Sequence, residues 1–185
     1  IYNKSTPQTQ TAKYIIAATQ NSKPIELTPI SDVQGLHEAY KRPTHLYIHS
    51  NTLYVAGADI TDLQDDYDDL GIPFHQTSNS LRYNNAIDLL DVNPDVQHIV
   101  GHSLGGSVAL ELQNNFKDTN YNVNTYGAPV ASLSPLLSNR YRNKYDPVSM
   151  LDFGAVTEYP LSLNPHQYDN FDKNMVSDKP VKSFV

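Results

Sequence analysis

The chain of 185 residues contains no cysteine, and its basic residues are few. Without thiols there is neither a disulfide framework nor a cysteine-based metal cluster, and a cysteine nucleophile is excluded. The 13 Lys and Arg stand against 20 Asp and Glu, which gives a formal net charge of −7 at pH 7. Nucleic acids and anionic membranes attract basic surfaces, so the composition argues against either as a partner.

Long apolar runs are also missing. No segment approaches the roughly 18 apolar residues of a membrane span. The first ten residues, IYNKSTPQTQ, contain neither an initiator methionine nor the apolar centre of a signal peptide. We therefore expect a soluble acidic protein that is a processed or excised piece of a longer chain. The sequence leaves its cellular compartment open.

The length predicts one domain with a substantial core. The first 44 residues are weakly patterned, and we expect them to form an N-terminal segment packed on that domain, with a helical turn within HEAYKRP. The core is predicted to span residues 45–170. Residues 171–185 would form a C-terminal tail.

The predicted core begins with a hairpin. Residues 45–49 and 52–56 have the apolar content of two strands, and Ser50-Asn51 joins them. Asn tolerates positive φ, which favours a tight turn at this point. An Asp-rich stretch follows, for which a short helix is expected before Gly71 and Pro73.

Strand and helix patterns alternate beyond residue 80. We predict a helix from Ser80 to the VNP sequence at residues 92–94, a strand at 96–100, an amphipathic helix at 104–116 and a further strand within YNVNTYGAP. Such alternation predicts an α/β fold with a mostly parallel central sheet flanked by helices.

A serine lies at the junction between the strand at 96–100 and the helix at 104–116. The residues from Gly101 to Gly105 fit the pattern G-x-S-x-G. Small residues two before and two after the serine permit a sharp turn between a strand and a helix, which projects the serine Oγ outward. We therefore interpret Ser103 as a nucleophile.

A serine hydroxyl is a poor nucleophile until a base takes its proton, so a histidine is required. In α/β-hydrolases the histidine follows the serine along the chain, and of the seven histidines here only His166 does. The residue preceding the nucleophile, His102, cannot readily reach its neighbour's Oγ. All six histidines before the serine are expected to lie on the surface or to pack on strands. They are His37, His45, His49, His75, His98 and His102.

The third member of such a triad is a carboxylate between the serine and the histidine. Asp146 is the best placed of five, because it follows a predicted strand that Pro147 ends, which frees the side chain. Asp152 is the alternative. The other three are Glu111, Asp118 and Glu158.

Four consecutive motifs resemble the landmarks of the class 3 lipases, a branch of the α/β-hydrolases. They are GHSLGGSVALEL, NTYGAPVAS, NKYDPVSML and HQYDN, and the similarity covers roughly residues 45–170. The resemblance implies an α/β-hydrolase-like fold with Ser103, Asp146 and His166 as the catalytic triad. It also implies a lipase, phospholipase or esterase that cleaves lipid or lipid-like esters and needs neither a cofactor nor a metal.

The chain departs from the family in its oxyanion hole. The family's strand and loop normally end in Phe-Arg-Gly-Thr or Phe-Arg-Gly-Ser, whereas this chain has Ala56-Gly57-Ala58 and so lacks the hydroxyl. The hole would then consist of two backbone N–H groups, those of Leu104 and Ala58.

The stretch that resembles the family's lid is short and acidic. The simplest interpretation of this stretch is a solvated helix face. A calcium site is a weaker alternative, because the carboxylates lack the spacing of a known calcium-binding loop. Beside the active site it would repel anionic head groups, so transient contact with neutral lipid surfaces is expected. The acidic residues are Asp59, Asp62, Asp65, Asp66, Asp68 and Asp69.

Two other functions fit the same sequence. The lost hydroxyl at Ala58 also suits a catalytically degenerate hydrolase retained as a binding or structural module. An acyltransferase would use the same triad and differ only in the acyl acceptor, an alcohol in place of water. The sequence does not distinguish acyl lengths, head groups or oligomeric states.

Overall fold

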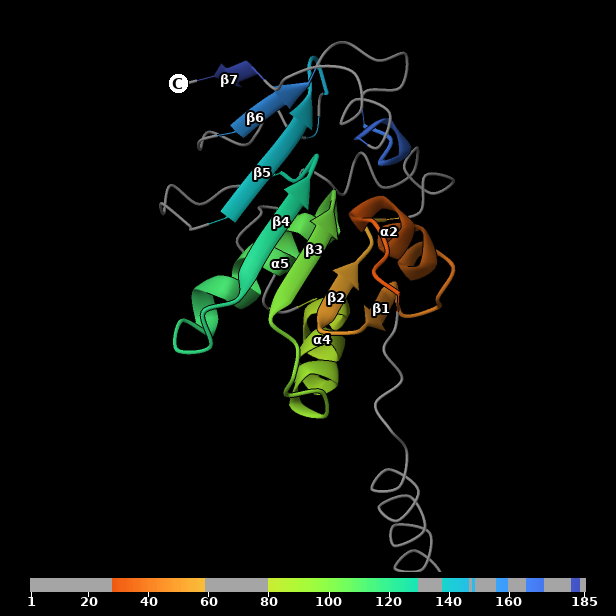
Figure 1. The fold of residues 1–185 in the computed structure, drawn as a ribbon, viewed down its shortest axis with the longest axis vertical. Helices are drawn as coiled ribbons and strands as arrows, with labels where there is room; N and C mark the ends of the chain where they lie inside the picture. Colours follow the sequence, from red (N-terminus) through yellow and green to blue (C-terminus); the bar gives the residue numbers. More distant parts are fainter. Residues whose placement is uncertain are drawn as a thin grey trace, which may run out of the picture.

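The fold is that of a computed structural model of the chain. It describes residues 28–58, 80–129, 138–146, 148, 156–159, 166–171 and 181–183. In this part of the chain, helices α2 (Asp32–Tyr40), α4 (Leu81–Asp91) and α5 (Leu104–Asn115) pack on a seven-stranded sheet (Figure 1).

The strands lie across the sheet in the order in which they occur along the chain. The first pair and the last pair are antiparallel, and the four pairings between them are parallel. The described chain is therefore an α/β protein with a largely parallel sheet, as the alternating pattern predicted. The strands are β1 (Leu46–His49), β2 (Thr52–Val55), β3 (His98–His102), β4 (Asn122–Tyr126), β5 (Ser138–Asn143), β6 (Val156–Tyr159) and β7 (Val181–Ser183).

Two helices cover one face of the sheet. Helix α4 (Leu81–Asp91) connects β2 to β3, and α5 (Leu104–Asn115) connects β3 to β4. The strands advance in one direction, and right-handed crossovers then place both connecting helices on the same side. Figure 1 shows α5 behind β3 and β4.

Helix α2 (Asp32–Tyr40) packs on the end of the sheet that β1 and β2 form. It begins at Ser31, whose Oγ accepts a hydrogen bond from the N–H of Gln34 while the Gln34 side chain accepts from the N–H of Ser31. This capping box satisfies amide groups that the first helical turn leaves unpaired. The helix is longer than the predicted turn within residues 37–43.

Alternation along the strands separates two clusters of buried side chains, because successive residues of a strand point to opposite faces. Leu53, Val55 and Ile99 belong to the cluster beneath α4 and α5. Tyr54 and Val100, their neighbours along the chain, belong to the cluster beneath α2. The sheet thus forms the middle of three layers.

The hairpin between β1 and β2 is confirmed, with Leu46 opposite Val55 and His49 opposite Thr52. The reason given for its tight turn was wrong, because Ser50, with φ of 53°, takes the positive φ in place of Asn51. The helix predicted from Ser80 is confirmed one residue later, and Ser80 is its N-cap, with Oγ accepting a hydrogen bond from the N–H of Tyr83. Strand β3 begins two residues later than predicted, at His98.

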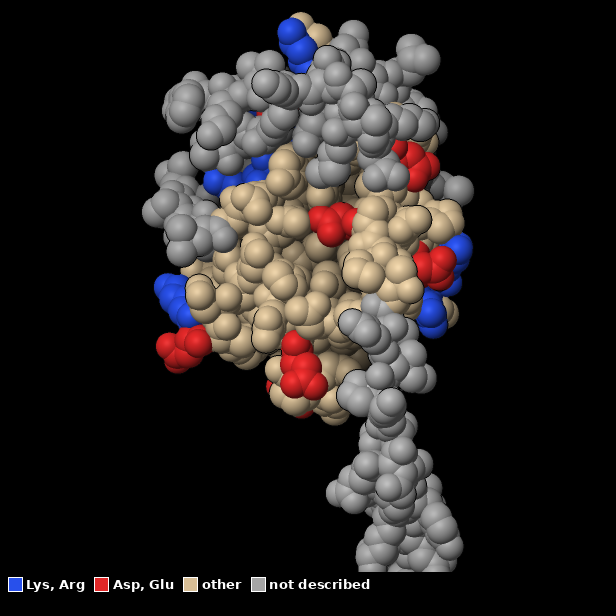
Figure 2. Space-filling model, viewed as in Figure 1, with Lys and Arg blue, Asp and Glu red and all other residues tan. Residues whose placement is uncertain are grey.

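Several predictions fall on residues outside those described. The acidic stretch from Asp59 to Asp69, Asp152 and His75 are among them. The domain boundaries after residues 44 and 170 stay predictions. In the described residues no helix has the length and apolar character needed to cross a membrane. Figure 2 shows a mostly uncharged surface on one face, where the described charged side chains lie in small groups, with acidic and basic residues beside one another at the edges.

Candidate active site

The carboxyl ends of the parallel strands carry the predicted site residues. Strands β2 to β6 run in the same direction, so their carboxyl ends meet at one edge of the sheet. Ligands of open parallel sheets bind at this edge. Ala58 lies just beyond β2, Ser103 follows β3, Asp146 lies beyond β5, and His166 comes after β6.

Ser103 occupies a strained turn. Its φ of 54° and ψ of −129° lie outside the regions that residues with a side chain favour. Helix α5 approaches two strands closely at this turn. A Cβ on Gly101 of β3 would lie 2.4 Å from the carbonyl oxygen of Gly105, and a Cβ on Gly105 would lie 2.2 Å from the carbonyl oxygen of Val55 in β2. Only glycine fits at these two positions, which is the physical reason for the G-x-S-x-G spacing.

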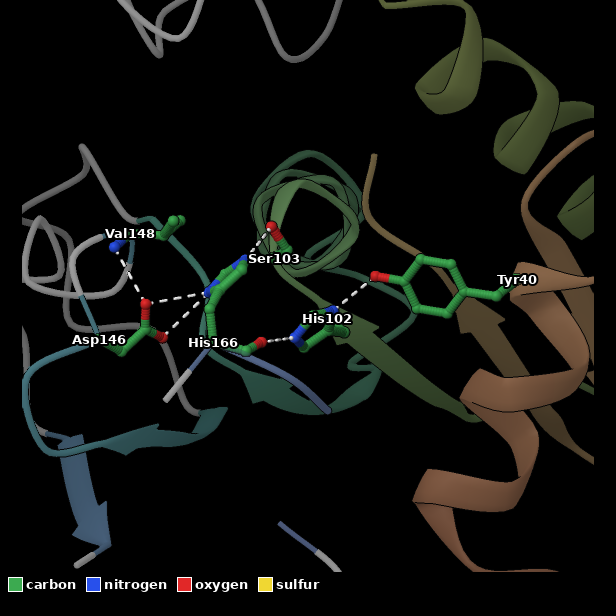
Figure 3. A network of polar contacts seen from close by, with 6 residues as sticks. All are labelled: Tyr40, His102, Ser103, Asp146, Val148 and His166. Carbon is green, nitrogen blue, oxygen red and sulfur yellow. Dashed lines mark hydrogen bonds and ion pairs between the residues drawn. The ribbon is translucent and has the colours of Figure 1, made fainter. Parts of the chain in front are cut away.

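The structure brings the three predicted triad residues into one hydrogen-bonded row (Figure 3). The Oγ of Ser103 lies 2.8 Å from Nε2 of His166. On the other side of the imidazole, Nδ1 lies 3.0 Å and 3.1 Å from the two carboxylate oxygens of Asp146. A carboxylate only accepts, so Nδ1 carries the proton and Nε2 of the neutral ring is left to accept from the serine.

Asp146 is fully buried, and its side chain is fixed in two ways. Besides His166, its Oδ1 accepts a hydrogen bond of 3.0 Å from the N–H of Val148. A buried carboxylate needs such partners to stay ionised. The burial and the orientation suit a group that stabilises positive charge on the imidazole.

Gly127 leaves room for this pair, which sequence reasoning did not predict. It follows β4 with φ of 58°, and a Cβ there would lie 3.0 Å from Oδ2 of Asp146 and 3.3 Å from Nδ1 of His166. Both the backbone and the space therefore require glycine. The signal in the sequence was the Gly of NTYGAP directly after a strand.

The predicted oxyanion donors are the N–H of Leu104, which follows the serine directly, and the N–H of Ala58, which follows a residue packed against the serine. Leu104 is the first residue of α5. Gly57, which precedes Ala58, lies against the serine, since a Cβ on it would be 2.7 Å from Cβ of Ser103. Across the described part of the chain, no hydrogen bond occupies either N–H group.

His102 packs on the sheet as the last residue of β3, one of the two placements predicted for it. It is only 1% exposed, and its two ring nitrogens contact Tyr40 and the backbone of His166. Burial, followed by the neighbouring His166, lowers the pKa of His102 to about 3. The ring is therefore neutral near pH 7. No motif in the sequence indicated these contacts.

The described residues contain no group of three or more His, Asp or Glu side chains that could hold a metal ion. The arrangement contains a serine hydroxyl, an imidazole, a buried carboxylate and two backbone N–H groups. Groups of these kinds suit acyl transfer through a serine.

Comparison with protein-family models gives no match, and comparison with curated proteins gives none either. Among solved structures, the chain is similar to the crystal structure of Lip2 lipase from Yarrowia lipolytica, at 19% sequence identity and a TM-score of 0.38. The similarity covers 63% of this chain and 61% of that one, so the chain spans less than two thirds of that lipase. Likeness at this level carries no functional argument, and function has to be argued from the site.

Proposed function

We propose that this chain is a serine hydrolase of the α/β-hydrolase type that cleaves carboxylic esters through an acyl-enzyme. The observation that carries the proposal is the row from Ser103 through His166 to the buried Asp146, with 2.8 Å between Oγ and Nε2. The strained turn at Ser103 supports it, because strain of this kind is kept where the surrounding structure holds a functional group in place.

In the first half of the reaction, Oγ of Ser103 attacks the carbonyl carbon of the ester while Nε2 of His166 takes its proton. The N–H groups of Leu104 and Ala58 hold the negative charge that develops on the carbonyl oxygen. His166 then gives the proton to the departing alcohol, and the acyl group stays on Ser103.

In the second half, a water molecule loses a proton to His166 and attacks the acyl carbon. The tetrahedral intermediate collapses, the proton returns to Oγ of Ser103, and the carboxylic acid leaves. Asp146 keeps the imidazole in the required tautomer and stabilises its charged form. Nothing in this sequence of steps requires a cofactor.

The substrate class rests on the resemblance of four sequence motifs to the class 3 lipases. We propose lipid or lipid-like esters, and neutral or zwitterionic ones over anionic ones because the net charge is −7. Repulsion from anionic vesicles should weaken as salt is added, since exposed charges are screened over about 8 Å at physiological ionic strength.

A hydrolysis panel tests both parts of the proposal. Short-chain esters, triglycerides and phosphatidylcholine vesicles are incubated with the wild type and with Ser103→Ala. We expect turnover by the wild type, covalent labelling of Ser103 by a fluorophosphonate, and loss of essentially all activity in the variant, because removal of a serine nucleophile costs up to about 10⁶-fold in kcat. More than about a hundredth of the activity in the variant, or no labelling of the wild type, contradicts the mechanism.

A further inference from the structure

The proton transfer proposed above leaves one buried histidine without a function. Nε2 of His102 lies 2.8 Å from the carbonyl oxygen of His166, and Nδ1 lies 2.6 Å from the hydroxyl of Tyr40 (Figure 3). The Tyr40 hydroxyl also lies 3.0 Å from the N–H of Gly57. A chain of hydrogen bonds thus runs from the backbone beside Ala58 to the backbone of the proposed base.

The donor and the acceptor of each hydrogen bond in this network follow from the chemistry of its atoms. A carbonyl oxygen only accepts, so Nε2 of His102 carries the proton. A neutral ring has one N–H group, and Nδ1 therefore accepts from the Tyr40 hydroxyl. The Tyr40 oxygen in turn accepts from the N–H of Gly57. Every polar atom named in this hydrogen-bond network has a partner, which makes the network rigid.

A second histidine holds the same loop from the other side. Nδ1 of His45 lies 2.9 Å from the carbonyl oxygen of Gly57 and donates to it. This carbonyl belongs to the planar trans peptide that also carries the N–H of Ala58, and in such a peptide the two groups point in opposite directions. The hydrogen bond from His45 therefore fixes the direction in which Ala58 donates.

Aromatic packing supports the network. Tyr40 stacks on Tyr168 with ring centroids 4.9 Å apart and an interplanar angle of 12°. Tyr168, two residues beyond His166, also meets Nδ1 of His37 through its hydroxyl at 2.9 Å. Helix α2 is thereby joined to the segment that carries the proposed base.

We propose that Tyr40, His45 and His102 are positioning residues that orient the Gly57–Ala58 peptide for oxyanion binding and hold it in register with His166. This inference rests on the proposed ester hydrolysis and extends it to how the oxyanion hole is built. Ala58 has no hydroxyl, so the hole depends on the direction of a backbone N–H. That direction is what the three side chains fix.

The first test removes one hydroxyl. In Tyr40→Phe, the N–H of Gly57 and Nδ1 of His102 lose their partner while the aromatic ring stays. We expect kcat for a soluble short-chain ester to fall by about 10- to 100-fold with KM nearly unchanged, since a small displacement of catalytic groups can cost about 10²-fold. The matched control is Tyr47→Phe, which loses a hydroxyl contact of 3.3 Å to His49 elsewhere on the same face. Equal kcat in Tyr40→Phe, the control and the wild type overturns the proposal.

The second test distinguishes the contributions of the two ring nitrogens of His102. His102→Asn keeps an acceptor near the position of Nδ1, His102→Gln keeps a donor near the position of Nε2, and His102→Ala keeps neither. We expect each amide variant to have a kcat several-fold above that of the alanine variant. Equal kcat in all three, at matched circular dichroism, contradicts a role through hydrogen bonding.

A third measurement needs no substrate. Amide hydrogen exchange by NMR should show the N–H of Gly57 protected in the wild type and in Tyr47→Phe, and exchanging at least tenfold faster in Tyr40→Phe. Unchanged protection overturns the network. Loss of protection together with a wild type that neither hydrolyses esters nor reacts with a fluorophosphonate supports the network and overturns only the proposed function.

Discussion

The two faces of the sheet are built from different side chains. The aliphatic face is the one beneath α4 and α5, where Ile99 of the sheet and Val108 and Leu112 of α5 are fully buried in one cluster. The face beneath α2 contains tyrosines and histidines whose polar atoms are paired, among them Tyr126, which donates to Asp32 over 2.8 Å. Aliphatic contacts supply stability without direction, whereas hydrogen bonds fix orientation.

The two faces are expected to contribute differently to stability and to kcat. We expect changes on the aliphatic face to lower the free energy of unfolding and to leave kcat of the folded molecules near its wild-type value. Changes to the hydrogen-bonded residues Tyr40, His45 and His102 of the aromatic face, or at the sheet edge where the two faces meet, should alter kcat more than stability. The predictions at Asp146, Leu112 and Gly127 test this division.

The largest effect is expected at Asp146, at the sheet edge. Asp146→Asn cannot stabilise a charged imidazole, and its amide group favours the wrong tautomer of His166. We expect kcat to fall by about 10⁴-fold, the size of loss known for such a change in a serine triad. Initial rates on a soluble ester measure it, with Asp169→Asn, an exposed carboxylate three residues beyond His166, as the control. A loss below about tenfold would mean that Asp146 is not the triad acid.

The aliphatic face is tested by Leu112→Ala. Leu112 is 0% exposed on α5, so the substitution leaves a cavity and should lower the free energy of unfolding by about 2–5 kcal/mol. Urea unfolding measures this loss. Rates normalised to the fraction labelled by a fluorophosphonate should stay within about threefold of the wild type. A tenfold fall in the normalised rate would break the division between the faces.

Gly127→Ala adds one methyl group beside the triad. The new Cβ would lie 3.0 Å from Oδ2 of Asp146, and φ of 58° strains any residue with a side chain. We expect kcat to fall by up to about 10²-fold through displacement of Asp146 and His166, and stability to fall by about 1–3 kcal/mol. Enzyme kinetics and thermal unfolding measure the two effects. Leu112→Ala, on the aliphatic face, is the control and should lose stability while kcat of its folded molecules stays near the wild-type value.

The last prediction concerns the pH dependence of stability at His102, which involves no change in kcat near pH 7. Burial lowers its pKa to about 3, below the value near 6.5 of an unfolded chain, so the unfolded state binds more protons between these values. The stability that this neutral histidine contributes is full above pH 6.5 and is lost as the pH falls toward 3. The loss is at most about 1.4 kcal/mol per pH unit.

Urea unfolding at pH 7, 5.5 and 4 tests this effect. Wild type should lose more stability on acidification than His102→Asn, which has no group to titrate at this position. Because each protein is compared with itself across the pH values, the cost of the substitution at pH 7 cancels. Parallel curves for the two proteins would mean that His102 is accessible to protons in the folded state.

The sequence alone determined the local features of this protein. The turn at Ser103 could be predicted because it depends on Gly101 and Gly105, whose missing side chains permit the close contacts whatever lies elsewhere. The hairpin of β1 and β2, the helix near Ser80 and the largely parallel sheet followed from short-range patterns of turn residues and apolar periodicity, although the positive φ of the turn is at Ser50 and not at Asn51. His166 was proposed as the base from its position after the serine, and Asp146 as the carboxylate from its place after a predicted strand.

Only the tertiary structure decided which side chains hold these groups in place. Tyr40 and His102 meet across 62 residues, and His102 and the backbone of His166 across 64. Neither separation leaves a periodic signal in a sequence, and each residue by itself suits ordinary packing. The contacts arise because α2 packs on the face of the sheet where His102 lies, and because parallel strands bring distant loops to one edge. The orientation of a hydrogen bond is set by the positions of both its partners, and those positions exist only once the layers have packed.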